Sequence, residues 1–194
     1  MKKLLLILFL FGCENIITDI SDNPDDNPDS ANYGIVINEI NYNSSSDSNL
    51  NAGDWIELYN PTNQAIEMSL WEFRDEDNIF TFPENIILAP GGYLVLCQNL
   101  DVFSQIFSSV SNTLGDLEFG LNGAGELIRL FDPDGILVDG VEYDDIAPWP
   151  IDPDGYGPTL ELIDSSLDNA LGENWDASNE NGGTPGEINS VVNE

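Results

Sequence analysis

The stretch DWIELYN, residues 54–60, decides the fold predicted for this chain. Alternate residues of a β-strand point to opposite faces of its sheet, whereas a helix repeats its apolar positions every three or four residues. Ile56 and Leu58 therefore share one face and are expected to enter a core, while Trp55 and Glu57 lie on the other. The turn-forming sequence NPTN follows, so the stretch is predicted to be a short strand that ends in a turn.

The preceding stretch YGIVINEINYN, residues 33–43, has the same period but changes phase once. The apolar set that includes Ile37 resumes at Ile40 rather than at Glu39. An extra residue in one strand of a pair produces this kind of shift, because two residues then oppose one on the partner strand. The stretch is therefore predicted to be a strand with a β-bulge near Asn38 and Glu39.

The rest of the chain supplies further short apolar runs, each bounded by Gly, Pro, Asn or Asp. These runs are AIEMSLWEF, IFTFP, ENIILAP, GGYLVLCQN, GELIRLFD and GILVDGVEYD. Only DVFSQIF, residues 101–107, has helical spacing, with Val102, Phe103 and Ile106 on one side. Asp101 is its predicted N-cap. Many short strands with few helices are typical of a sandwich or barrel, so we predict an all-β protein with a single domain.

The N-terminus has the pattern of a secretory signal. In MKKLLLILFLFGCEN, two lysines precede a short apolar run, a glycine and Cys13. The run is too short to cross a bilayer, which needs roughly 20 helical residues. Residues 1–12 are therefore predicted to be a signal peptide. The sequence LFGC, residues 10–13, resembles the lipobox of bacterial lipoproteins, and this implies lipidation of Cys13. An ordinary secretory peptide with an incidental cysteine is the alternative.

The segment that follows separates this leader from the strands. Residues 13–32 are rich in Asp, Asn and Pro and bury too little apolar surface to offset chain entropy. They are predicted to be a disordered acidic tether, followed by the strand-rich domain at 33–190 and a tail at 191–194. With a lipidated Cys13, the tether would hold the domain away from a membrane of the bacterial cell envelope, to which the chain is expected to be exported.

The charge of the chain excludes several classes of protein. It has 36 acidic residues, 4 basic residues and no histidine, for a formal charge of −32. Loss of the signal peptide would leave Arg74 and Arg129 as the only basic residues, which gives 2 − 36 = −34. Nucleic-acid binding depends on Lys and Arg, so DNA and RNA are excluded as partners. The absence of histidine excludes His-based triads and His-bound zinc.

Acidic residues remain as candidates for chemistry. Glu39 and Glu57 lie in neighbouring predicted strands and could face each other as a carboxylate pair of the kind that cleaves glycosides. With 36 acidic residues, however, some pair falls close by chance, and we expect no enzymatic activity. Acidic clusters could instead bind calcium outside the cell, or be solvated loop residues. The candidate clusters are Asp75, Glu76 and Asp77, and Asp144 with Asp145.

Two DPDG sequences, at 132–135 and 152–155, raise the same question of calcium. Aligned with an EF-hand loop, the second puts Pro150 at the first ligand position and the first puts Leu130 there. Asp-Pro-Asp-Gly is instead well suited to a type I turn, which is our interpretation. Cys97 lies in a strand run and is expected to be a small buried hydrophobe.

Aromatic residues near predicted loops suggest a second kind of site. Flat rings at loop tips hold sugars in many binding proteins, although tryptophan more often fills a core or closes the end of a sandwich. Both interpretations stay open for this chain. The residues concerned are Trp71, Trp149, Tyr156 and Trp175.

Taken in order, the motifs of the domain resemble those of the lamin tail domain over nearly all of residues 33–190. They are VINEINYN (36–43), GDWIELYNPTNQAIEMSLWEFRD (53–75), FTFP (80–83), LAPGGYLVL (88–96), GELIRLFDPDG (125–135), YDDIAPWP (143–150) and NW…GGTPGEIN (174–189). Leu70 departs from the pattern, in a position often held by Gly. The resemblance implies an immunoglobulin-like antiparallel β-sandwich, which agrees with the period of two, and a binding or scaffolding unit without catalytic residues.

These observations predict a lipid-anchored envelope protein that binds a protein or glycan through the loops of its sandwich. No cofactor is expected, apart from a possible weakly bound calcium ion. Two alternatives stay open. One is a hydrolase assisted by Ca²⁺ or Mg²⁺ that uses acidic loop residues, and the other is a structural protein that associates with itself through strand edges.

Overall fold

The computed structural model describes residues 33–47, 49 and 51–192. The predicted signal peptide (1–12), Cys13 and the rest of the predicted tether (13–32) lie outside the described residues, as do residues 193–194. No helix among the described residues is long and apolar enough to span a bilayer.

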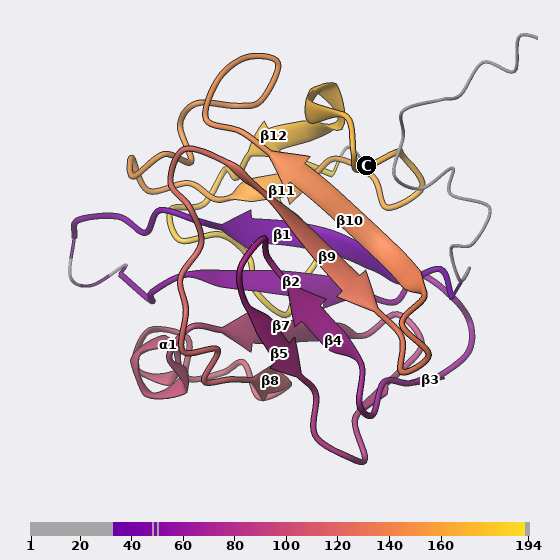
Figure 1. Ribbon diagram of the computed structural model, residues 1–194. Helices are drawn as coiled ribbons and strands as arrows, with labels where there is room; N and C mark the ends of the chain where they lie inside the picture. The colour runs from indigo at the N-terminus through magenta and orange to yellow at the C-terminus, as the bar shows by residue number, and fades with distance from the viewer. Residues whose placement is uncertain (1–32, 48, 50, 193–194) are drawn as a thin grey trace, which may run out of the picture.

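Two facing sheets form the molecule (Figure 1). The larger has six strands in the order β12-β11-β1-β2-β7-β8. Their bounds are β12 Trp175–Ala177, β11 Leu160–Leu162, β1 Val36–Asn41, β2 Trp55–Tyr59, β7 Tyr93–Cys97 and β8 Thr113–Leu114. The smaller has four strands in the order β10-β9-β4-β5. Their bounds are β10 Leu137–Tyr143, β9 Glu126–Phe131, β4 Glu72–Arg74 and β5 Ile79–Thr81. A separate two-stranded pair joins β3 (Ile66–Glu67) to β6 (Ile87–Leu88).

The core lies between the two sheets, as the period of two predicted. Ile56 and Leu58 are fully buried in it. The register of β1 against β2 shifts between Ile37 and Glu39, which confirms the predicted bulge. The bulge puts both Ile37 and Ile40 into the core, although they are three positions apart in the sequence.

One pair of strands departs from the antiparallel arrangement. β8 runs parallel to β7, and the other pairings are antiparallel. A parallel neighbour requires a crossover connection, which the segment that contains helix α1 (Leu100–Ile106) supplies. The run GGYLVLCQN predicted β7, but none of the runs predicted β8 or its parallel direction.

Helix α1 confirms the predicted helical segment but begins one residue earlier, and its N-cap is Asn99 rather than Asp101. The Asn99 side chain accepts a hydrogen bond from the Val102 N–H at 2.9 Å. Only Phe103 of the predicted apolar face is fully buried, whereas Val102 is 37% exposed. The side-chain oxygen of Asn99 thus accepts from a helical N–H that would otherwise be unpaired. The sequence pattern had predicted this capping role for the next polar residue, Asp101.

The two DPDG sequences form turns that differ by one position. In the first, the Gly135 N–H donates to the Asp132 carbonyl at 3.0 Å, as the type I interpretation requires. In the second, the Asp154 N–H donates to the Ile151 carbonyl at 3.2 Å, so this turn begins one residue before the motif.

Cys97 is fully buried, as expected. Burial, with a smaller contribution from Asp116, raises the pKa of its thiol to about 12. The thiol therefore stays protonated and unreactive near neutral pH.

Candidate functional site

The outer face of the six-stranded sheet, turned away from the core, carries a group of buried acidic side chains. Helix α1 covers one end of this face, where Phe103 packs on Trp55 with ring centroids 5.9 Å apart. Beyond the end that α1 covers, β2 carries Glu57 and then Tyr59 on this face. A C-terminal segment, residues 178–192, crosses the acidic part, and we call it the C-terminal strap. Figure 1 shows it in yellow on the far side of the sheet.

Glu39, Glu57 and Glu161 lie abreast on three neighbouring strands, and we call them the carboxylate row. Glu39 is the register partner of both Glu57 and Glu161. Paired residues on adjacent strands share a face, so the side chains point the same way. All three have 0% exposure. The expectation that Glu39 and Glu57 face each other is confirmed, and Glu161 is the member that the sequence analysis missed.

The strap and its neighbours donate hydrogen bonds to Glu39 and Glu57. Glu39 Oε1 accepts from the Thr159 hydroxyl at 2.5 Å and from the Thr184 N–H at 3.1 Å. Glu57 accepts from the Gly186 N–H at 2.6 Å and from the Asn38 side chain at 3.0 Å. The strap therefore contacts both carboxyl groups through its backbone.

Glu161 has three donors, all from the strap. The hydroxyls of Thr184 and Ser190 donate to it at 2.8 and 2.7 Å, and the Val191 N–H donates at 3.1 Å. The strap also closes on itself, because the Asn179 N–H donates to the Ser190 hydroxyl at 2.7 Å. The whole segment thus docks on the sheet through the carboxylate row.

Burial without a positive partner raises the pKa of two members of the row. The pKa of Glu39 lies well above its usual 4.5, first because of burial and then because of Glu57 and Glu161. Burial raises the pKa of Glu57 to about 8, despite the hydrogen bonds from Gly186 and Asn38. Glu39 Oε2 has no hydrogen-bond partner among the described residues. Because the strap covers this row, the structure does not present Glu39 and Glu57 to a substrate as a glycosidase pair.

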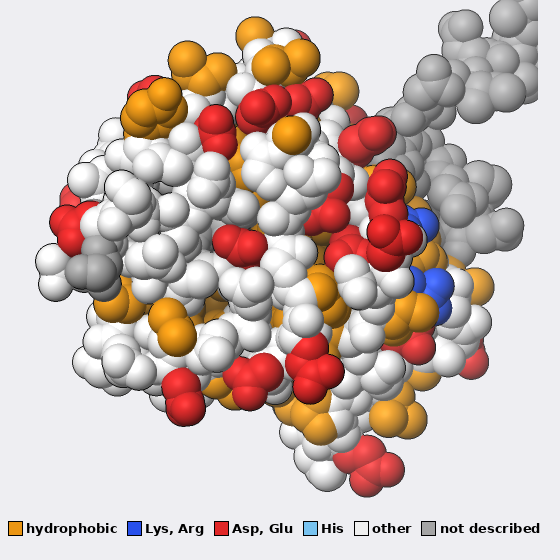
Figure 2. Space-filling view, turned by 60° about the vertical axis from the view of Figure 1, so that its left-hand side comes forward, with side chains coloured by type: hydrophobic (Ala, Val, Ile, Leu, Met, Phe, Trp, Pro, Cys, Tyr) orange, Lys and Arg blue, Asp and Glu red, His pale blue; other side chains and the backbone are white. Residues whose placement is uncertain are grey.

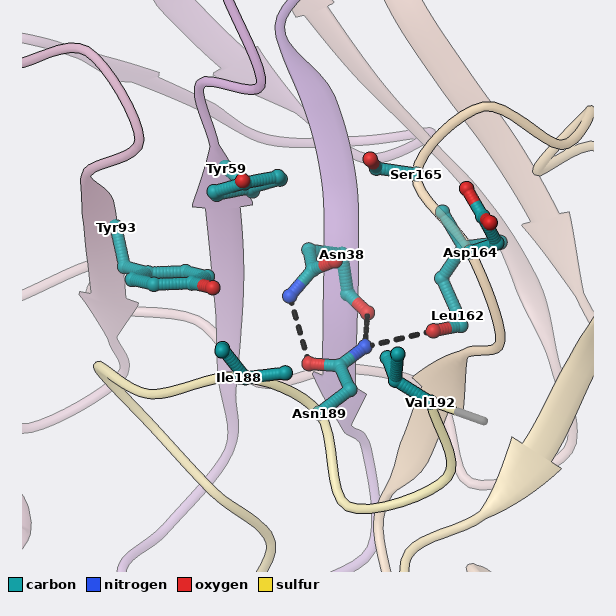
Figure 3. Close-up of a pocket in the computed structure, with 9 residues that line it drawn as sticks. All are labelled: Asn38, Tyr59, Tyr93, Leu162, Asp164, Ser165, Ile188, Asn189 and Val192. Carbon is teal, nitrogen blue, oxygen red and sulfur yellow. Dashed lines mark hydrogen bonds between the residues drawn. The ribbon is translucent and has the colours of Figure 1, made fainter. Parts of the chain in front are cut away.

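A hollow of about 210 Å³ opens beside the strap, and Figure 3 shows the residues that line it. We call it the tyrosine hollow. Tyr59 and Tyr93 stack at its edge, with ring centroids 4.6 Å apart and an interplanar angle of 19°. Ile188, Asn189 and Val192 of the strap form another part of its lining. A larger hollow of about 390 Å³ adjoins the strap from Pro185 to Glu187 and shares Tyr93.

Asn189 fixes the floor of the tyrosine hollow. Its side-chain oxygen accepts from the Asn38 amide at 2.7 Å, and its nitrogen donates to the carbonyls of Asn38 and Leu162 at 3.0 and 2.9 Å (Figure 3). Through these hydrogen bonds the Asn189 side chain links the strap to both β1 and β11. The shape of the hollow therefore depends on the strap staying in place.

The four aromatic candidates do not form a shared sugar platform. Trp71, Trp149 and Trp175 are buried, and Trp149 packs on Trp175 with ring centroids 5.9 Å apart. The Trp175 indole N–H donates to the Asn169 carbonyl at 2.7 Å. These rings fill the core or close an end of the sandwich, which is the more usual of the two roles considered for them. Tyr156 alone of the four is exposed, at 76%.

The two acidic candidates for calcium shape local loops. Asp75 Oδ1 accepts from the N–H groups of Asp77 and Asn78 at 2.7 and 2.5 Å. Asp144 Oδ1 accepts from the Asp145 N–H at 2.7 Å. Within residues 33–47, 49 and 51–192, no group of three or more acidic, Cys or His side chains has the arrangement of a metal site. The structure thus does not bring either cluster together as a set of metal ligands.

The loop between β10 and β11 exposes apolar side chains at one end of the sandwich. Ile146, Ile151 and Tyr156 are 63%, 60% and 76% exposed. Trp149 lies in the same loop but is buried, so it attaches the loop to the core. Figure 2 shows hydrophobic side chains beside carboxylates at the top of the molecule, where Figure 1 shows this loop. This loop therefore combines a fixed base with an exposed apolar tip.

These features define an immunoglobulin-like β-sandwich of a binding or structural type. The model of the Lamin Tail Domain family matches residues 28–145, more than half of the chain. The chain therefore belongs to the lamin tail domain family, whose members are immunoglobulin-like and generally non-catalytic. Strands β11 and β12 and the strap lie beyond the matched residues. A search of curated protein sequences finds no match to this chain.

Proposed function

We propose that this chain is a lipid-anchored binding module of the bacterial cell envelope, and that it recognises a protein partner through the loop between β10 and β11. The observation that carries the proposal is the exposure of Ile146, Ile151 and Tyr156 in this one loop. Isolated apolar side chains are common on protein surfaces, whereas several together mark interaction sites. The lipobox-like sequence that ends at Cys13 supports the anchor.

A protein partner agrees with the side chains of the loop better than a glycan does. Sugars stack on exposed flat rings, and Tyr156 is the one ring of the four candidates that is exposed. Isoleucine side chains instead fill apolar pockets of another protein. Asp144, Asp145 and Asp152 lie in the same loop, so the partner should surround its apolar pocket with basic residues.

Site-specific photocrosslinking tests this proposal. A photoreactive residue at position 156 of the full chain, expressed in its envelope, should crosslink to one discrete protein. The double variant I146S/I151S should abolish that crosslink, because it removes the apolar contacts. A photoreactive residue at position 87 is the matched control, since Ile87 is 60% exposed on β6 and outside the loop. A crosslink that the double variant leaves unchanged, or a glycan adduct in place of a protein, would contradict the proposal.

A further inference from the structure

We propose that the C-terminal strap is a proton-dependent latch. Protons held in the carboxylate row fix the strap on the sheet at acidic and neutral pH, and their loss at alkaline pH releases the strap and opens the tyrosine hollow. This inference does not depend on a partner for the loop between β10 and β11. It rests on the geometry of the row, on the charges around the row and on the way the strap is attached.

The geometry of the row opposes three negative charges. Neighbouring strands of a sheet lie about 4.8 Å apart, so carboxyl groups that are abreast on adjacent strands are close neighbours. Glu39 lies between Glu57 and Glu161 in the register and is fully buried with them. Buried like charges at such separations repel strongly, because little water screens them.

The surroundings of the row supply no positive charge to relieve this repulsion. Among the described residues the only basic side chains are Arg74 on β4 and Arg129 on β9, in the opposite sheet. Arg74 pairs with Glu72, and Arg129 donates to the Asp75 carbonyl at 2.8 Å.

Apart from the Cys97 thiol on β7, which burial keeps protonated, the titratable groups on the elements packed around the row are acidic or phenolic. On the sheet, Asp176 is the register partner of Glu161, and Asp139 of β10 accepts from the Ile37 N–H. Tyr59, Tyr93 and Asp164 line the tyrosine hollow, and Glu180 and Glu187 belong to the strap itself. Burial, Tyr59 and Glu57 together raise the pKa of Tyr93 to about 12, so its hydroxyl is neutral in the pH range of the latch.

Glu39 gives a second, independent indication that the row holds protons. Its Oε2 is buried and has no hydrogen-bond partner among the described residues, while Oε1 accepts two hydrogen bonds. A buried carboxylate anion with one oxygen unsatisfied is far less stable than the neutral acid. The side chain is therefore neutral while the strap covers it.

The direction of the pH dependence follows from proton counts. An unfolded glutamate releases its proton near pH 4.5, whereas the pKa of Glu57 in the closed structure is about 8 and that of Glu39 is raised well above 4.5. Above pH 4.5 the closed state thus binds more protons than a state with a solvated row, and its stability falls as the pH rises. The closed strap is fully favoured below pH 4.5 and loses this advantage as the pH rises through about 8.

The strap is the segment over the carboxylate row that is free to move away from it. It contains no strand or helix, and the backbone groups of Thr184, Gly186 and Val191 attach it to the row. Once Glu39 and Glu57 lose their protons, water must reach them, and the movement of the strap admits it. Release also removes Ile188 and Val192 from the tyrosine hollow, because both belong to the strap.

Carboxyl and backbone ¹³C NMR of the full chain between pH 4 and pH 10 tests the latch without any ligand. The side-chain carboxyl signal of Glu57 should titrate near pH 8, and that of Glu39 well above pH 4.5. Backbone signals of residues 183–191 should move to values of an unfolded segment in the same transition, while those of β1, β2 and β7 stay unchanged. Titration of both glutamates near pH 4.5, or a strap that stays closed at pH 10, would overturn the proposal.

Two variants separate the latch from general alkaline effects. In E39Q the amide NH₂ occupies the unpartnered Oε2 position and cannot lose a proton, so the release of the strap should move up by at least one pH unit or disappear. E187Q removes an exposed charge of the strap and should leave the release unchanged. Equal behaviour of the two variants, or loss of the sheet signals together with those of the strap, would show that no separate latch exists.

Discussion

Gly183 lies where the strap comes closest to the carboxylate row. Its φ is +77°, in the left-handed region that favours glycine. A Cβ atom added there would lie 1.9 Å from Glu39 Oε1 and 2.6 Å from Thr159 Oγ1. Two requirements thus coincide at one residue, an unusual backbone conformation and an absence of side-chain atoms. Gly135 has almost the same φ, +78°, but open space around its Cβ position.

At the residue scale, G183A should destabilise the domain more than G135A does. Both variants pay the cost of left-handed alanine, about 1–2 kcal/mol. G183A should lose about 1–3 kcal/mol more, because overpacking displaces buried groups. Urea denaturation of the two variants measures the difference. Equal losses of unfolding free energy would show that the strap does not press on Glu39.

The carboxylate row also shows how far single residues could be predicted from the sequence. Glu39 and Glu57 lie in consecutive strands, and the phase change of β1 moves Glu39 to the outer face with Glu57, so their pairing could be predicted from the sequence. Glu161 lies in LEL, which has the same alternation, but no local pattern indicates which strand β11 pairs with. The burial of Trp149 and Trp175 could likewise not be predicted from local sequence, because it depends on contacts between distant segments.

At the scale of elements, helix α1 covers the apolar end of the outer face. It begins at a side-chain cap, Asn99, and buries Phe103 against Trp55. Asp101 lies in the first turn, where a carboxylate interacts favourably with the helix dipole but does not cap. The cap and the dipole contact are therefore separable by substitution.

N99A should reduce the unfolding free energy by about 1 kcal/mol, because an N–H of the first turn loses its acceptor. D101A should have about half that effect, since it removes only the dipole interaction. Urea denaturation gives the global values, and amide exchange in residues 100–106 shows whether the helix itself is weakened. A larger loss for D101A than for N99A would restore Asp101 as the cap.

Elements with a clear period could be predicted from the sequence, and elements fixed by distant contacts could not. Strands β1, β2 and β7 are five or six residues long and rich in β-branched, aliphatic and aromatic residues between turn signals, which is enough to assign them. β8 has two residues, and its parallel pairing depends on the crossover through α1. The strap contains GGTPGEIN, which has no period, so only its hydrogen bonds to the row reveal its position.

At the scale of the whole molecule, the two ends of the domain meet in one sheet. β11 and β12 follow the four-stranded sheet in sequence but return to pair beside β1. The family match ends at residue 145, before these strands, yet the six-stranded sheet and the cover of the carboxylate row require them. The first described residue, Tyr33, packs on Trp71 with ring centroids 4.9 Å apart. The N-terminal end of the domain is thus packed on a core residue at the point where the predicted tether would join it.

The anchor is the property of the whole chain that a single substitution tests most directly. Acyl chains add about 0.8 kcal/mol of membrane affinity per buried methylene, so two or three chains on Cys13 hold a protein durably. Expressed with its leader in a bacterium that processes lipoproteins, the full chain should sediment with membranes and incorporate a labelled fatty acid. C13S should lose the label and leave the membrane fraction. C97S is the matched control and should keep both, because Cys97 is buried and outside the leader. Membrane association that survives C13S would indicate an incidental cysteine in an ordinary secretory peptide.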